Sequence, residues 1–299
     1  MATAFGNALE AQFNALYGPI AFPDEVNKFT ALTDAVTAVG AMGYDVEVYH
    51  GATSQVNFPP NPPFTRKAPQ CELCDLAFVA FAGNEIRLSF MQVKDKKDGK
   101  PPFPLYMANT EQFDVLKRRP PITAWLGTAV WPTDILNNAI LASIGSFGVF
   151  YGSIAAANVD FHYSPADMLW VSAGPAAGGM YITSTLSLTA GSPPYRTNLG
   201  YEEVTQCTGI ADFGRHYFLL EVGTPIHPYA DTVSPISANR ERATVNIRRS
   251  LARWIDAQLE RGPVLDQLRQ LLQVEAPAEP TVASLGVKKL VVLNGTPNE

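Results

Sequence analysis

The sequence contains few of the residues that form disulfide frameworks or zinc sites, and it has no long apolar run. Its 299 residues include 3 cysteines, which cannot all pair, and 4 scattered histidines. A zinc site needs about four ligands, so the CxxC pair of Cys71 and Cys74 is expected to be structural. No stretch approaches the roughly 18 consecutive apolar residues of a membrane span, and the opening residues do not predict a signal peptide. These absences predict a cytoplasmic protein with reduced thiols and no membrane partner.

The composition predicts a folded chain. Hydrophobic residues make up 46% of the sequence and charged residues 17%, which is enough apolar material for a large core. The net charge of −6 does not exclude nucleic acid as a partner, because basic residues can cluster where phosphates lie. A Walker A pattern, which would indicate a nucleotide-driven enzyme, is absent.

Hydrophobic periodicity predicts an α/β fold. Apolar residues recur at helical spacing over residues 4–16 and 24–39, and a short helix is expected at 110–118. Strands are expected at 44–50, 73–81 and 85–94, where the sequence alternates or is rich in β-forming residues. The second half contains further strand-bearing segments, including the apolar piece KKLVVL at 288–293.

The two strongest strands form a predicted hairpin that brings polar residues together. Gly83-Asn84 suits a two-residue type II′ turn, so paired residues have numbers that sum to 167. Asp75 then lies opposite Gln92 and projects from the same face. Lys94, two residues further, shares that face.

The polar group at the end of this hairpin follows strands that are otherwise apolar. Burying such groups is costly unless they are solvated, paired or bound to a ligand. Mg²⁺ prefers oxygen ligands and keeps several waters, so a carboxylate, an amide oxygen and a substrate phosphate would hold it; Mn²⁺ is a further option. The alternative is that these residues form a solvent-exposed hairpin end without chemistry.

The pattern D-x(n)-(E/Q)-x-K across adjacent strands resembles the PD-(D/E)XK nuclease superfamily. Asp75 matches the metal-binding Asp, and Gln92-Val93-Lys94 match the (E/Q)-x-K element. The glutamine version is similar to the Mrr-type branch and to bacterial antiphage-defence nucleases. Two departures are that Cys74 stands where the motif has Pro, and that Gln92 replaces the more frequent Glu.

The resemblance implies a restriction-endonuclease-like fold, with a mixed central β-sheet flanked by helices and additional C-terminal α+β elements. It implies a nuclease core over residues 1–130, and an extension over 131–299 that completes the fold, serves oligomerisation or regulation, or does both. The alternative is that both parts form one domain. It also implies a metal-binding Glu on the first helix, for which Glu10 is the candidate and Glu25 the second choice. A further catalytic Gln would be Gln112.

The implied function is Mg²⁺-dependent hydrolysis of DNA by an antiphage-defence effector, with RNA as another substrate to consider. Four basic residues near the motif are expected to contact phosphates without reading sequence: Lys96, Lys97, Arg118 and Arg119. Another copy of the chain or a defence-system protein is the expected protein partner. The alternative is a catalytically inactive nucleic-acid-binding or assembly subunit, which the loss of charge at Gln92 favours.

Overall fold

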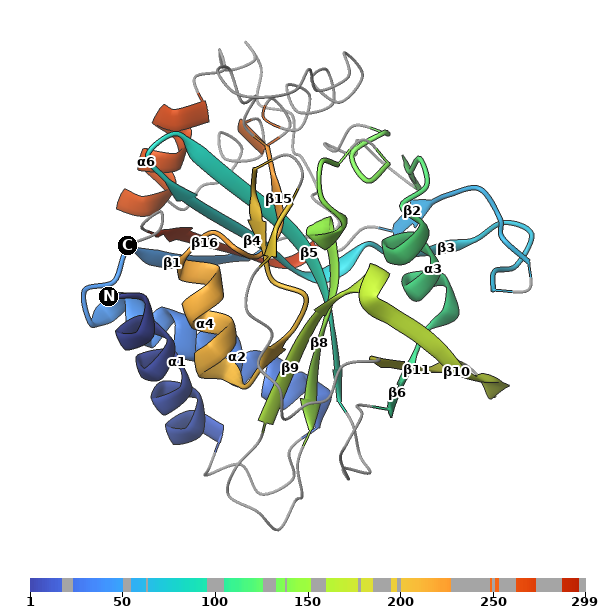
Figure 1. The fold of residues 1–299 in the computed structure, drawn as a ribbon, viewed down its shortest axis with the longest axis horizontal. Helices are drawn as coiled ribbons and strands as arrows, with labels where there is room; N and C mark the ends of the chain where they lie inside the picture. The colour runs from blue at the N-terminus through green and yellow to red at the C-terminus, as the bar shows by residue number, and fades with distance from the viewer. Residues whose placement is uncertain are drawn as a thin grey trace.

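The chain forms a mixed central β-sheet with helices on both faces, as Figure 1 shows. This confirms the predicted α/β class. The computed structural model describes residues 1–17, 24–50, 55–62, 64–95, 105–125, 133–137, 139–151, 160–176, 179–184, 195–197, 200–226, 248, 251–252, 262–272 and 287–295.

The helices pack in two layers against the sheet. One layer contains α1 (Ala2–Tyr17), α2 (Glu25–Ala41) and α4 (Ile210–Phe218), whose apolar side chains share one core cluster. The other face is covered by α3 (Thr110–Arg118) and α6 (Pro263–Leu272), which contribute to a second cluster. The sheet is therefore buried on both faces, and all nine residues of its central strand β4 are buried.

The central sheet has the strand order β1-β16-β4-β5-β8-β9-β14, and β15 also pairs with β5. Its strands are β1 (Val46–His50), β4 (Cys74–Ala82), β5 (Glu85–Asp95), β8 (Gly145–Tyr151), β9 (Asp160–Pro165), β14 (Cys207–Thr208), β15 (Thr224–Pro225) and β16 (Val287–Asn294). β16 runs parallel to β4, and β8 runs parallel to β5. Strands from both sides of residue 130 thus build one sheet.

The described residues also form smaller sheets and two 3₁₀ turns. One three-stranded sheet contains β2 (Gln55–Asn57), β3 (Gln70–Glu72) and β7 (Thr123–Ala124), and a second contains β6 (Leu105–Ala108), β10 (Leu169–Ala176) and β11 (Gly179–Ser184). A two-stranded pair joins β12 (Tyr195–Arg196) to β13 (Glu202–Glu203). The 3₁₀ turns η1 (Ala142–Ile144) and η2 (Ala166–Met168) precede β8 and β10 respectively.

The hairpin of β4 and β5 has the predicted register. Leu76 pairs with Met91, and the pairing continues to Ala82 opposite Glu85, so each pair of numbers sums to 167. Gly83 has a φ of 54°, which is the left-handed conformation that the first central residue of a type II′ turn requires. The local turn and the alternating pattern therefore set the pairing.

Side-chain caps fix the start of two helices, α2 and α3. The Asp24 carboxylate accepts a hydrogen bond from the backbone N–H of Asn27 at the start of α2, and the Asn109 side chain does the same for the first turn of α3. Such caps satisfy N–H groups that have no partner within the helix. None of the helices in the described ranges is long and apolar enough to cross a membrane.

Candidate functional site

A group of polar residues lies at one edge of the central sheet, where β4 and β16 begin and β5 ends. The register places Val287 beside Cys74, so Lys288 is the neighbour of Asp75 in the next strand. Extending the hairpin register by one residue places Gln92 on the other side of Asp75. We refer to Glu72, Asp75, Gln92 and Lys288 as the Asp75 cluster.

Asp75 is nearly buried, with 7% of its side chain exposed. Its Oδ2 accepts a hydrogen bond of 2.9 Å from the backbone N–H of Val93, and its Oδ1 accepts one of 2.5 Å from Lys288 Nζ. The side chain therefore bonds the β5 backbone where regular pairing with β4 stops. Both of its oxygens are held in fixed positions.

Lys288 lies between two carboxylates. Its ammonium is 2.5 Å from Asp75 and 3.3 Å from Glu72, and 43% of its side chain is exposed. Burial would lower the pKa of Lys288, but the Asp75 and Glu72 carboxylates outweigh it and raise that pKa above its ordinary value. The lysine is therefore a stable cation at neutral pH.

Gln92 is completely buried and leaves one polar atom without a partner. Its Nε2 donates a 3.4 Å hydrogen bond to the backbone carbonyl of Glu72, which holds the amide within the cluster. Its Oε1 is buried and has no hydrogen-bond partner within the described part of the chain. A buried oxygen of this kind costs about 1–3 kcal/mol, so it marks a position that can accept a donor or a cation.

Lys94 also lies at the edge of the sheet, but its recorded ion pair is with α2. Its Nζ is 3.6 Å from Glu25 Oε1, while Glu25 Oε2 accepts a 3.3 Å hydrogen bond from the backbone N–H of Asp95. Asp95 in turn pairs with Lys28 at 2.5 Å, and both of those side chains are nearly buried. The first turn of α2 is thereby fixed to the end of β5.

Of the two acids considered on the first helices, Glu25 is the one that contacts a motif residue. Glu10 lies on α1 beside Gly209, the residue that caps α4. Gln112 lies in the first turn of α3, half-buried, and its backbone N–H is capped by Asn109. Their roles in a site remain predictions.

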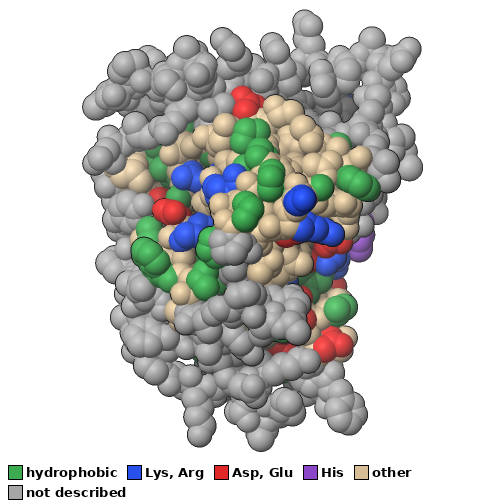
Figure 2. Space-filling view, turned by 90° about the vertical axis from the view of Figure 1, so that its right-hand side faces the viewer, with side chains coloured by type: hydrophobic (Ala, Val, Ile, Leu, Met, Phe, Trp, Pro, Cys, Tyr) green, Lys and Arg blue, Asp and Glu red, His purple; other side chains and the backbone are tan. Residues whose placement is uncertain are grey.

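The predicted phosphate-binding residues are only partly visible. Lys96 and Lys97 lie outside the described residues. Arg118 binds Asp114 at 2.7 Å and the Pro59 carbonyl at 2.5 Å, whereas Arg119 has a buried Nε without a partner in the described ranges. The face shown in Figure 2 carries separate groups of Lys and Arg side chains between hydrophobic and polar ones.

A second set of potential ligands, which the sequence reasoning missed, lies near α4. The ligand atoms of Cys207, Asp212 and His216 all lie within 4.8 Å of one another. Here both ring nitrogens of His216 have protein partners, with Nδ1 bonded to Glu221 and Nε2 lying 2.6 Å from Arg215. Burial also raises the pKa of the Cys207 thiol well above its ordinary value, so the thiol is protonated. A metal ion could bind this group only if these internal contacts were broken.

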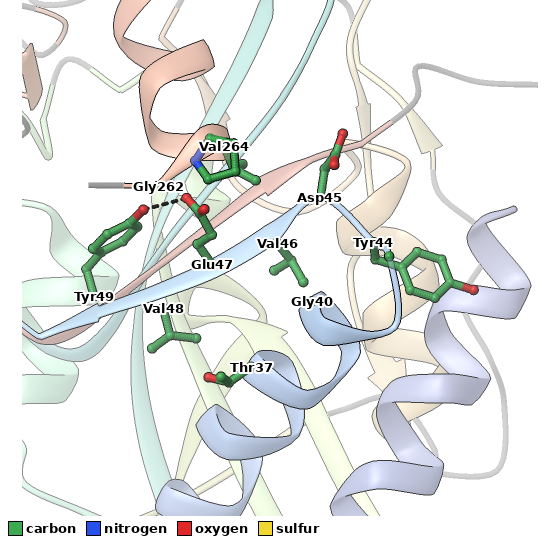
Figure 3. Close-up of a pocket in the computed structure, with 12 residues that line it drawn as sticks. Thr37, Gly40, Tyr44, Asp45, Val46, Glu47, Val48, Tyr49, Gly262 and Val264 are labelled. Carbon is green, nitrogen blue, oxygen red and sulfur yellow. Dashed lines mark hydrogen bonds between the residues drawn. The ribbon is translucent and has the colours of Figure 1, made fainter. Parts of the chain in front are cut away.

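A groove of about 620 Å³ lies between β1, the end of α2 and the start of α6. Figure 3 shows Glu47 and Tyr49 on the α6 side of β1 and Val46 and Val48 on the α2 side. The Glu47 carboxylate accepts hydrogen bonds from the Tyr49 hydroxyl and from the backbone N–H of Leu265. The Glu47 carboxylate therefore holds the first turn of α6 in place.

A buried histidine on β9 predicts an acid-sensitive stability. Burial lowers the pKa of His162 from 6.5 to about 4, so the unfolded chain binds the proton first as the pH falls. Stability should decline between pH 6.5 and 4, by about 3 kcal/mol from this group. In His162→Gln, urea unfolding at several pH values should lose this dependence.

His216 has the opposite effect on the pH dependence of stability, and it is present in both wild type and His162→Gln. Burial would lower its pKa, but the Asp212 and Glu221 carboxylates outweigh it and raise that pKa. Its contribution is present below pH 6.5 and is lost as the pH rises through the raised value. It therefore cancels in the comparison, and equal pH profiles for wild type and His162→Gln would contradict the prediction.

Comparisons of the chain with protein-family models, curated proteins and solved structures found no match.

Proposed function

We propose that the chain is a metal-dependent nuclease whose cation is held by Asp75 and Gln92. The observation that carries this proposal is the buried Oε1 of Gln92, which has no partner among the described residues although it belongs to a cluster with two carboxylates. A divalent cation would give this oxygen a partner. The cation would also be attracted by the negative charge of the Asp75 carboxylate at the edge of the sheet.

The donor set fits Mg²⁺ or Mn²⁺ better than a softer metal. Asp75, Gln92 and Glu72 offer oxygen atoms, which hard cations prefer, and such sites keep several waters. Two thiols lie nearby, but burial raises the pKa of Cys71 and Cys74 above the ordinary value. Each thiol would have to lose its proton to bind a metal ion, and burial opposes that loss.

The fold is consistent with a restriction-endonuclease-like assignment, which we propose on the motif and the architecture together. The resemblance implies a mixed sheet flanked by helices, and the chain has such a sheet. The two motif strands are adjacent and antiparallel, as the D-x(n)-(E/Q)-x-K pattern needs for its polar residues to meet. Architecture of this kind is shared by many functions, so the argument for activity depends on the site.

The roles of the residues follow from their charges and positions. When bound, a divalent cation polarises a phosphate and makes its bound water a better nucleophile. Asp75 and Gln92 would hold and orient that cation, since both side chains are fixed by hydrogen bonds to backbone groups. Lys94 would offset negative charge that develops on the phosphate, with Glu25 keeping its ammonium at the end of β5.

DNA is the proposed substrate, with RNA as the second nucleic acid to assay. Arg118 and Arg119 stay proposed phosphate contacts, although the Arg118 guanidinium binds Asp114. A role in antiphage defence is proposed from the family resemblance only, and so is a protein partner from a defence system.

Metal removal tests this function directly. Purified protein is incubated with plasmid DNA, or with RNA, in Mg²⁺, in Mn²⁺ and in EDTA. Cleavage is expected with either cation and none in EDTA, because the proposed site has no other source of an activated water. Nucleic-acid binding that is the same in EDTA and never leads to cleavage would favour the inactive binding subunit instead.

A further inference from the structure

Lys288 occupies the place in the Asp75 cluster that a cation would take. Its ammonium contacts Oδ1 of Asp75 and lies 3.3 Å from a Glu72 oxygen. The other oxygen of Asp75 is used by the backbone of β5. The positive charge that these carboxylates need is therefore supplied by the chain itself.

The contact comes from tertiary structure, since Lys288 and Asp75 are 213 positions apart in the chain. β16 enters the sheet beside β4 in parallel register, with Lys289 next to Leu76. Alternation along β16 then turns Lys288 toward the face that carries Asp75, and Lys289 toward the opposite face, where it binds Thr33. The position of Lys288 is thus fixed by pairing of the strands.

We propose that the Lys288 ammonium is a built-in competitor for the divalent cation, which binds Asp75 only after displacing it. This inference rests on the proposed function and adds a means of regulating its metal site. Two cations close to the same carboxylate oxygen repel each other, so both cannot hold Oδ1 of Asp75 at once. The concentration of cation needed to fill the site is raised accordingly.

Lys288 is the partner that can move. It has 43% of its side chain exposed and a flexible four-carbon stem, whereas Asp75 is only 7% exposed and is bonded to the β5 backbone. Displacement therefore moves the lysine toward solvent and leaves the carboxylate in place.

Binding of Mn²⁺, followed by the loss of the free-ion signal in electron paramagnetic resonance, tests this competition without any substrate. The full chain is compared with Lys288→Met, which removes the charge, and with Lys288→Gln, which keeps a hydrogen-bond donor. Both should bind Mn²⁺ roughly two- to fivefold more tightly than wild type, as expected for the loss of one partly exposed ion pair. Lys289→Met is the matched control and should bind as wild type does.

The outcomes separate this inference from the proposed function. If wild type and both Lys288 variants bind Mn²⁺ with equal affinity, or the variants bind more weakly, Lys288 is not a competitor while the nuclease proposal stands. If neither wild type nor any of these variants binds Mn²⁺, the assignment of the Asp75 cluster as a metal site is wrong. Melting curves in EDTA establish that each variant is folded, and Lys288→Gln replaces Lys288→Met if only the former folds.

Discussion

Replacing Lys94 with alanine is expected to lower the rate of metal-dependent DNA cleavage at least about a hundredfold, the usual loss when one electrostatic contact to the transition state is removed. The ammonium lies at the end of β5, two residues beyond Gln92, and is held by Glu25 at 3.6 Å. Initial rates on plasmid DNA, measured in saturating Mg²⁺, give the effect.

Two further measurements separate a lost catalytic charge from a lost fold. Mn²⁺ binding by Lys94→Ala should be close to wild type, because no contact between Lys94 and the Asp75 cluster is recorded in the described structure. Lys67→Ala removes an exposed lysine from the loop before β3 and should leave the rate unchanged. A Lys94→Ala protein that cleaves as fast as wild type would refute the assignment of Lys94.

Replacing Gln92 with methionine is expected to abolish metal-dependent cleavage without destabilising the protein. Methionine is close to glutamine in size and has no oxygen that needs a partner, so the buried Oε1 and its cost disappear. In EDTA the free energy of unfolding should stay the same or rise by about 1 kcal/mol. Urea unfolding at pH 7.5 measures this change.

The same substitution should weaken metal binding. Changes to residues that only support a metal ligand cost about 10- to 100-fold in affinity, so the loss of a direct ligand should cost at least about tenfold. Gln12→Met, at a half-buried position of α1, is the matched control and should change neither property. A Gln92→Met protein that is strongly destabilised in EDTA would mean that the amide is a structural element of the core.

The hairpin could be predicted from the sequence because its information is local. A glycine suited to a positive φ, an alternating apolar pattern and a two-residue turn fix the register of β4 and β5. The helices near residues 4–16, 24–39 and 110–118 were also confirmed, since the apolar spacing that predicts them lies within each segment. Local rules thus place Asp75 and Gln92 on adjacent strands.

The ion pairs of the site could not be predicted in the same way. Lys288 belongs to a strand that was expected from its apolar pattern, but nothing in that pattern indicates insertion between β1 and β4. Glu10 was the first choice for a metal-binding Glu on a helix, yet Glu25 is the one that contacts Lys94. The reason is that the first turn of α2 packs beside the last residues of β5. Both contacts depend on how distant elements pack, which a single sequence does not encode locally.

Mn²⁺ binding to the full chain, compared with binding to Gln92→Met, decides whether the Asp75 cluster is a metal site. We expect one saturable site in wild type, and an affinity at least about tenfold weaker in the variant. Equal affinities, or no binding by either protein, would contradict the assignment of the Asp75 cluster as a metal site.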